Sequence, residues 1–337
     1  TASRTLTGVR ERQRRVHLVW SGPRFPYHGW LAIESALATM PEVVVDVHVV
    51  GDFSADDRLD RAARSARVSV VPFDPEQGFA GCPGGPERYL DLLARIPEAS
   101  ASAVSNLVRL AVLFEHGGIY LDTDVLVVRP LDDPGRGCYV GSELVWSAYL
   151  DWLADGATFT NVVRAAPWAT RWTARRIDAA VARGRLGVAG RLDERGSMRL
   201  KVNNAVIGAC AGSEFVGRAL ERALGADPTV RFALGPTLLD DVAIDHPELV
   251  DVLPPSRFYA VPPGQSFRLF EDVTLDLPDD AQVVHYVASN HRRLLDELDE
   301  DHPAFEDRRG VFWSEARRVR RWARDRELID FMARGIE

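Results

Sequence analysis

The sequence is poor in lysine and cysteine, and it has neither a long apolar run nor an excess of positive charge. Lys201 is the only lysine among 41 Lys and Arg residues in a chain of 337, which excludes nearly every mechanism built on a catalytic lysine. The three cysteines, Cys82, Cys138 and Cys210, lie far apart. This spacing fits neither a zinc cluster nor a disulfide scaffold, and it favours a reducing cytoplasm. No stretch approaches the roughly 20 apolar residues that a transmembrane helix needs.

The charge balance disfavours nucleic acid as a partner. Acidic residues number 49 against 41 basic ones, a net charge of −8, whereas nucleic-acid-binding domains are usually basic. The predominance of arginine indicates a GC-rich genome, so we expect a bacterial, cytoplasmic protein. The apolar residues 16–20 that follow the N-terminal arginines are too few for the core of a signal peptide.

Segments typical of strands and of helices alternate through the first third of the chain. Residues 16–20, 43–50 and 68–73 are apolar and mostly β-branched, and each run is bounded by turn residues. Residues 30–40 and 52–66 between them have helical character. This alternation predicts an α/β fold of the Rossmann type, with a mostly parallel sheet flanked by helices.

The most informative segment is a predicted helix over residues 102–116 and the strand after it. Gly117-Gly118 is suited to end the helix, because glycine adopts positive φ without strain. Asp122 and Asp124 follow at the strand end, where alternation would turn both side chains the same way. Two carboxylates at such a point form an oxygen site for Mg²⁺ or Mn²⁺. A metal there would neutralise a bound diphosphate and make it a better leaving group.

A second polar group accompanies the two aspartates. Ser105, Asn106 and Arg109 fall three and four residues apart, so they share one face of the predicted helix. That face lies opposite the apolar face, and we expect it to look into the same site.

The string Ser105-Asn106-x-x-Arg109, followed by Gly117-Gly118-Ile119-Tyr120-Leu121-Asp122-Thr123-Asp124, resembles the donor-sugar-binding DXD region of a glycosyltransferase family. The family includes yeast-type outer-chain α-mannosyltransferases, bacterial capsule transferases and the catalytic domains of clostridial glucosylating toxins. The resemblance is strong over about residues 100–131 and weaker elsewhere.

This resemblance implies a GT-A-like fold and a metal-dependent glycosyltransferase. The enzyme would use Mn²⁺ or Mg²⁺ and move a hexose-type sugar from a UDP- or GDP-linked donor to a hydroxyl of a glycan or small molecule, with retention of configuration. Donor binding would order residues 78–88 or the C-terminal part as a lid. The resemblance also implies roles for individual residues. The candidates are Trp20, Asn106, Arg109, Tyr120 and Asp122 for the donor; Asp124, Asp122 and His285 for the metal; and Asp122, Asn204 and Asp241 for catalysis.

Two departures from the family pattern leave alternatives open. The family usually has aspartate at the position of Asn106, so the donor preference can differ. It also tends to place a tryptophan soon after the late histidine, and none follows His285; Asn290 or His291 could serve in its place.

We expect a single domain over residues 1–337. Residues 1–131 would form the nucleotide-sugar half and residues 132–300 the acceptor half, with a helical insertion at about 140–200. Residues 301–337 would end in an arginine-rich amphipathic helix, which packs on the body or binds a membrane surface peripherally.

Two other functions remain open from the sequence. A haloacid-dehalogenase-type phosphatase also places Asp-x-Asp after a strand, but at the first strand of its sheet rather than 120 residues into the chain. An inactive sugar-nucleotide- or carbohydrate-binding homologue is the second alternative, and Asn106 is the residue that suggests it.

Overall fold

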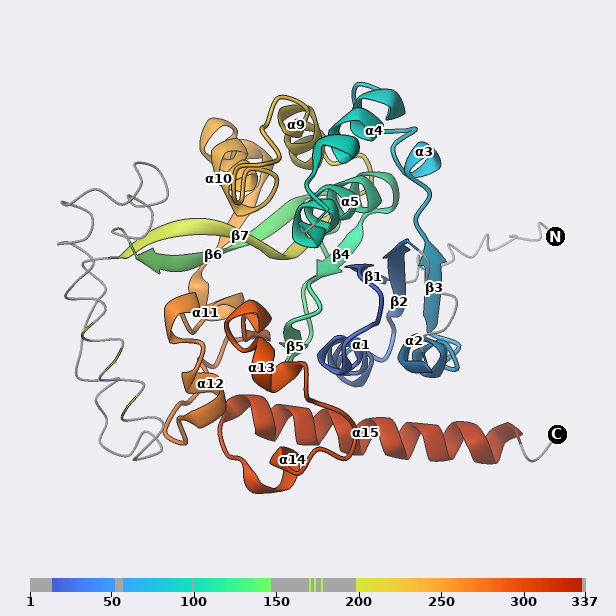
Figure 1. Ribbon diagram of the computed structural model, residues 1–337, viewed down its shortest axis with the longest axis vertical. Helices are drawn as coiled ribbons and strands as arrows, with labels where there is room; N and C mark the ends of the chain where they lie inside the picture. Colours follow the sequence, from blue (N-terminus) through green and yellow to red (C-terminus); the bar gives the residue numbers. More distant parts are fainter. Residues whose placement is uncertain are drawn as a thin grey trace, which may run out of the picture.

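The computed structural model describes residues 14–51, 57–98, 100–146 and 198–334, together with isolated positions 170, 173 and 177. Most of the helical insertion predicted at about 140–200 therefore lies outside the described residues. The described chain forms a seven-stranded sheet in the order β3-β2-β1-β4-β7-β6-β8 (Figure 1).

Parallel pairing dominates this sheet, as the sequence predicts. β1 pairs in parallel with β2 and β4, and β2 with β3, whereas β7 runs antiparallel between β4 and β6. The α/β prediction of a mostly parallel sheet flanked by helices is confirmed. The strands are β1 (Arg15–Ser21), β2 (Val44–Val50), β3 (Val68–Pro72), β4 (Gly118–Leu121), β6 (Cys138–Trp146), β7 (Met198–Ala209) and β8 (Asp251–Leu253).

Helices cover both faces of the sheet because its inner strands are apolar on both sides. Val16 and Leu18 of β1 belong to one core cluster, and Val19 belongs to the other. Figure 1 shows the two helical layers on opposite sides of the strands. One layer holds α4 (Pro86–Arg95), α5 (Ala101–His116), α9 (Glu214–Ala223) and α10 (Pro236–Asp245); the other holds α1 (Tyr27–Thr39), α2 (Asp57–Ala62) and α15 (Val311–Arg334).

A second, two-stranded sheet joins distant parts of the chain. β5 (Val125–Val127) directly follows the acidic pair and runs antiparallel to β9 (Val283–His285). The register places Val125 opposite His285. The late histidine is thereby brought beside the acidic pair, 160 residues away in sequence.

The twin glycines end α5 as the sequence predicts. Gly117 has φ of 65° and Gly118 has φ of 103°, a region that favours glycine. A Cβ on Gly118 would also lie 2.7 Å from the carbonyl oxygen of Arg15 on β1. The pair thus turns the chain sharply from α5 into β4 while β4 lies against β1.

The glycine- and proline-rich loop at residues 79–86 lies between α3 (Pro75–Gly78) and α4, away from the pocket described below. Phe79 is fully buried and stacks on Tyr89 with ring centroids 4.7 Å apart. Burial of this aromatic pair anchors the loop in the core under α5. Residues 78–88 do not line the pocket, and their ordering as a lid on donor binding stays a prediction.

The predicted C-terminal amphipathic helix is α15, which packs along α1. The Arg326 guanidinium lies 2.9 Å from the Glu34 carboxylate, which is fully buried on α1. Arg61 of α2 reaches Glu327 at 2.8 Å. These ion pairs hold α15 against the body of the protein. Among the described residues, no helix has both the length and the apolar character needed to cross a bilayer.

Two buried histidines on β1 and β2 predict a loss of stability in acid. His17 Nδ1 lies 3.1 Å from His48 Nε2, and the other ring nitrogen of His17 lies 2.9 Å from the Gly117 carbonyl oxygen. Burial and the neighbouring His48 lower the pKa of His17 to about 3. Burial lowers the pKa of His48 to about 4, although Asp46 opposes this.

Because both folded-state pKa values lie below the unfolded value near 6.5, the unfolded chain binds more protons in acid. The stability contributed by neutral His17 and His48 is full above about pH 6.5 and is lost as the pH falls toward 4. Each histidine contributes about 1.4 kcal/mol per pH unit within this window. Urea unfolding at pH 7, 6 and 5 measures the effect, and His48→Gln should reduce the slope. An equal slope in the variant would contradict this origin.

Candidate functional site

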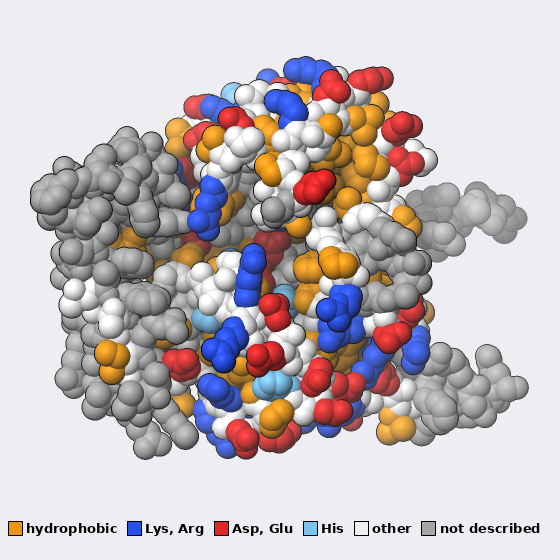
Figure 2. All heavy atoms as spheres, in the orientation of Figure 1, with side chains coloured by type: hydrophobic (Ala, Val, Ile, Leu, Met, Phe, Trp, Pro, Cys, Tyr) orange, Lys and Arg blue, Asp and Glu red, His pale blue; other side chains and the backbone are white. Residues whose placement is uncertain are grey.

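The main pocket opens at the C-terminal ends of β1 and β4, where open α/β sheets bind ligands. Its volume is about 1010 Å³, large enough for a nucleotide and a sugar. Figure 2 shows a hollow near the centre of this face, with acidic atoms inside it and basic side chains around it. The end of β1 contributes Trp20 to the wall. Its ring packs edge-on against Phe25, and its indole N–H is buried without a partner in the described part of the chain.

Asp122 and Asp124 both line this pocket, as predicted. The two side chains face the pocket for a different reason from the one predicted. β4 ends at Leu121, and residues 123 and 124 form a turn. The backbone N–H of Asp122 donates to the Ala205 carbonyl of β7 at 2.8 Å. The turn is therefore fastened to the neighbouring strand, and side-chain alternation along a strand does not explain the arrangement.

Arg109 is a buried cation that connects α5 to the acidic turn. Its guanidinium lies 3.0 Å and 3.3 Å from the two carboxylate oxygens of Asp122. It also donates to the Asn204 carbonyl at 2.6 Å and lies over the Tyr120 ring, 4.3 Å from the centroid. Burial lowers the pKa of Arg109, but Asp122, Tyr120 and Asp124 together raise it more, so the group stays charged.

Tyr120 supports Asp122 from beneath the pocket. It is fully buried, and its hydroxyl donates to Asp122 Oδ1 at 2.7 Å. Burial raises the pKa of Tyr120 well above its ordinary value, so the hydroxyl keeps its proton. Tyr120 does not line the pocket. Its predicted contact with the donor is therefore replaced by a role in orienting Asp122.

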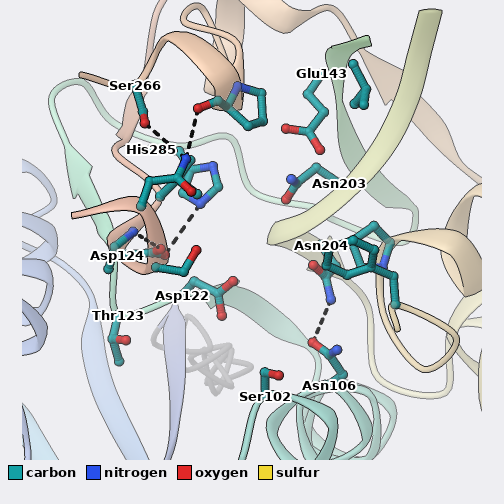
Figure 3. A pocket seen from close by; sticks show the side chains of 18 of the residues that line it. Ser102, Asn106, Asp122, Thr123, Asp124, Glu143, Asn203, Asn204, Ser266 and His285 are labelled. Atoms are coloured by element: carbon teal, nitrogen blue, oxygen red, sulfur yellow. Dashed lines mark hydrogen bonds and ion pairs between the residues drawn. The ribbon is translucent and has the colours of Figure 1, made fainter. Parts of the chain in front are cut away.

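Asp124 is held by groups that arrive from the end of β9. His285 Nε2 lies 3.5 Å from Asp124 Oδ1, and the Ala288 N–H donates to Asp124 Oδ2 at 2.8 Å (Figure 3). Burial of Asp124 raises its pKa, but His285 and the Ala288 amide lower it more. Between them, Val287 has φ of 52°, a strained conformation for a β-branched residue. This strain turns the Ala288 amide toward the carboxylate.

A bulge in β7 presents two asparagines to the pocket. Val140 of β6 pairs with Ile207, but the next residue, Gly141, pairs with Asn203, which leaves residues 204–206 without partners on β6. Gly141 is required there, because a Cβ would lie 2.5 Å from the Tyr259 ring. Bulges re-aim side chains in this way near active sites. Here Asn204 donates to Asn106 of α5 at 2.8 Å.

Hydrogen bonds between side chains and backbone groups stabilise the bulge, and a substitution of Tyr259 tests this. The Tyr259 hydroxyl accepts a hydrogen bond from the Val206 N–H at 3.0 Å. Tyr259→Phe would leave this buried amide unpaired, which should lower the free energy of unfolding by about 1–3 kcal/mol. Chemical denaturation measures the loss. A Tyr259→Phe variant as stable as the wild type would contradict the bulge argument.

The pocket brings together most of the residues predicted from sequence. Asp241 does not line it, but Asp240 does. Neighbouring residues on a helix point about 100° apart, so only one of this pair can face the pocket. Asp240 accepts hydrogen bonds from Lys201 and from the Val202 N–H, and so ties α10 to β7. The predicted residues that line the pocket are Trp20, Asn106, Arg109, Asp122, Asp124, Asn204, His285, Asn290 and His291.

Sequence reasoning missed two buried, titratable pocket residues, His28 and Glu143. His28 lies at the start of α1, its Nδ1 has no partner within the described ranges, and burial lowers its pKa to about 4. Glu143 lies on β6, and burial raises its pKa. Neither residue stands in a recognisable motif, so no local signal could have found them.

The acidic turn provides donors suited to a divalent metal. Asp122 and Asp124 supply carboxylate oxygens from one turn, and His285 stands beside Asp124. Within the described ranges, no three His, Cys, Asp or Glu side chains are grouped as a complete metal site. Mg²⁺-type ions are commonly held by one or two carboxylates plus phosphate oxygens of the substrate. The two aspartates fit that arrangement.

Comparison with known proteins identifies the segment that forms this turn. The model of a family described as "Glycosyltransferase sugar-binding region containing DXD motif" matches residues 89–139. This segment is therefore similar to the DXD region of that family. It contains α5, β4 and the turn with Asp122 and Asp124, in agreement with the resemblance seen in the sequence. No curated protein matches the chain by sequence.

Several solved glycosyltransferases are similar in structure to the chain at low identity. The PaToxG glycosyltransferase has 15% identity and a TM-score of 0.44, with 69% of each chain covered. The bifunctional glycosyltransferase WbbM has 10% identity and a TM-score of 0.42, covering 94% of this chain and 50% of its own. The galactosyltransferase LgtC with donor and acceptor sugar analogues has 14% identity and a TM-score of 0.36, covering 92% and 95%. At these values no residue role is transferred from them.

Proposed function

We propose that this protein is a metal-dependent glycosyltransferase that moves a sugar from a nucleoside diphosphate to an acceptor hydroxyl, with retention of configuration. The observation that carries the proposal is the turn with Asp122 and Asp124, which lies in a matched DXD segment at the floor of a pocket of about 1010 Å³. Phosphate oxygens and two carboxylates together complete the coordination that Mg²⁺ or Mn²⁺ prefers.

Different residues of the pocket are suited to bind different parts of the donor. Trp20 offers an aromatic face and a free indole N–H for the nucleotide base at the end of β1. Asn106 and Asn204, already joined by a hydrogen bond, are placed to contact sugar hydroxyls. Arg109 orients Asp122 rather than offering a free cation.

Asp124, with Asp122 and His285 beside it, would hold the metal, which when bound neutralises the diphosphate as the sugar departs. The protein's contribution is orientation and electrostatic stabilisation. The Ala288 amide and His285 keep Asp124 ionised, and the buried Tyr120 hydroxyl fixes the rotamer of Asp122.

A thermal-shift screen tests the proposal. UDP, GDP and their common sugars are added with and without Mn²⁺, because a ligand that binds only the folded state raises Tm by mass action. We expect one nucleotide series to raise Tm in a Mn²⁺-dependent manner and the same donor to be consumed on incubation. A metal-dependent shift without consumption would favour an inactive sugar-nucleotide-binding protein. Absence of any shift would contradict donor binding.

A further inference from the structure

A buried carboxylate faces the acidic turn from the opposite wall of the pocket. Glu143 of β6 is 7% exposed and lines the same cavity as Asp122 and Asp124. Figure 3 shows Glu143 and Asn203 side by side, across an open space from Asp122 and His285. A carboxylate is seldom buried unless it is paired or serves a function.

One oxygen of this carboxylate is buried without a partner among the described residues. The Asn203 side chain lies beside Glu143 and lowers its pKa. The carbonyl oxygen of that Asn203 amide already accepts from the Ala205 N–H at 2.8 Å, so its NH₂ group is the part that faces Glu143. Glu143 Oε2 is buried and has no partner among the described residues. Because an unpartnered buried carboxylate oxygen costs free energy, it is suited to a ligand group that enters the pocket.

The charged neighbours of Glu143 are occupied elsewhere. Lys201 lies opposite Glu143 in the register of β6 and β7, but its ammonium is paired with Asp240. His285 is paired with Asp124, and the Tyr259 hydroxyl accepts from the Val206 amide. Burial raises the pKa of Glu143, while the Asn203 side chain and His285 lower it less. A carboxylate with a raised pKa is a better proton acceptor near neutral pH.

We propose that Glu143 is a catalytic residue that binds the attacking hydroxyl of the acceptor. Its Oε2 accepts the hydrogen bond of that hydroxyl and then takes its proton. In this step the acceptor oxygen bonds to the anomeric carbon on the face that the diphosphate leaves, which retains the configuration, and the bond from that carbon to the phosphate oxygen breaks. The electron pair leaves with the diphosphate, and the proton ends on Glu143. The inference rests on the proposed glycosyl transfer and adds the group that receives the acceptor.

Glu143→Gln tests this role, because glutamine has nearly the same size and shape as glutamate but cannot take a proton. Water replaces the acceptor in slow donor hydrolysis, so the assay needs no identified acceptor. We measure release of UDP or GDP from UDP-glucose, UDP-N-acetylglucosamine and GDP-mannose with Mn²⁺. The variant should lose at least about 100-fold in kcat, the usual contribution of a positioned general base. Its thermal shift with Mn²⁺ and nucleoside diphosphate should equal that of the wild type.

Asp251→Asn is the matched control. Asp251 is an exposed carboxylate on β8, the strand next to β6, and it does not line the pocket. Donor hydrolysis within about threefold of the wild type in Glu143→Gln would overturn the inference. Loss of the nucleotide-dependent shift in that variant would also overturn it, because Glu143 would then support the donor site. If the wild type neither binds nor consumes any donor, the proposed function itself fails.

Discussion

Asp124→Asn is expected to abolish the Mn²⁺-dependent part of the thermal shift and to reduce donor consumption by about 1,000-fold. Stabilisation of a departing diphosphate by a metal supplies several kcal/mol, and each 1.36 kcal/mol corresponds to tenfold in rate. The Asp124 carboxylate is the donor that the Ala288 amide and His285 keep oriented and ionised. Asparagine has a similar shape but removes the charge. Differential scanning fluorimetry and a coupled assay for the released nucleotide measure the two effects.

The matched control for this change is Asp279→Asn, which removes one negative charge from an exposed position outside the pocket. It should leave both the shift and the rate unchanged. A full Mn²⁺-dependent shift in Asp124→Asn would show that Asp124 is not a metal ligand. Titration of Mn²⁺ at fixed nucleotide then separates weaker metal binding from weaker nucleotide binding, because only the former is overcome by excess metal.

Arg109→Ala is expected to cause the largest loss of stability among single changes in the site. The variant would leave the Asp122 carboxylate without its buried cation and the Asn204 carbonyl without its donor. Breaking a buried charge pair by removing one partner costs about 3 kcal/mol or more. Donor binding should fall as well, because Asp122 and Asn204 would both lose their orientation. Urea denaturation measures the stability, and the nucleotide thermal shift measures the binding.

Arg109→Lys distinguishes the effect of the positive charge from the effect of the guanidinium geometry. Lysine keeps the positive charge. It lacks the planar guanidinium group that contacts Asp122 and the Asn204 carbonyl at the same time. It should recover part of the stability and little of the donor binding. Arg218→Ala serves as the surface control, since its ion pairs with Glu214 and Glu221 are exposed and contribute little. An Arg109→Lys variant that binds the donor as well as the wild type would contradict the role assigned to the planar guanidinium group.

The local sequence predicted the parts of the site that lie close together in the chain. Helix α5, the twin-glycine turn and β4 occupy one continuous stretch, and their signals are helical periodicity and glycine at a position of positive φ. The same stretch carries Asn106, Arg109 and both aspartates. The prediction was less accurate where residues are adjacent in sequence but separate in space, as for Asp241, which lies outside the pocket while its neighbour Asp240 lines it.

Long-range pairing decided the remaining features of the site. β9 brings His285 to Asp124 by pairing with β5, and no pattern in either segment specifies that pairing. The burial of Glu143 follows from the position of β6 at the pocket wall, where a single glutamate in a strand carries no signal of its own.

The sequence by itself determined the α/β class, the parallel half of the sheet and the acidic turn, because these follow from short-range periodicity, turn residues and one contiguous motif. Only the tertiary structure decided the bulge of β7. That bulge exists because Tyr259, Asn203 and Arg109 satisfy backbone groups that would otherwise be unpaired. Tyr259 and Arg109 come from segments distant from β7, so their hydrogen bonds form only once the whole sheet is assembled, whereas the Asn203 hydrogen bond is local to the bulge.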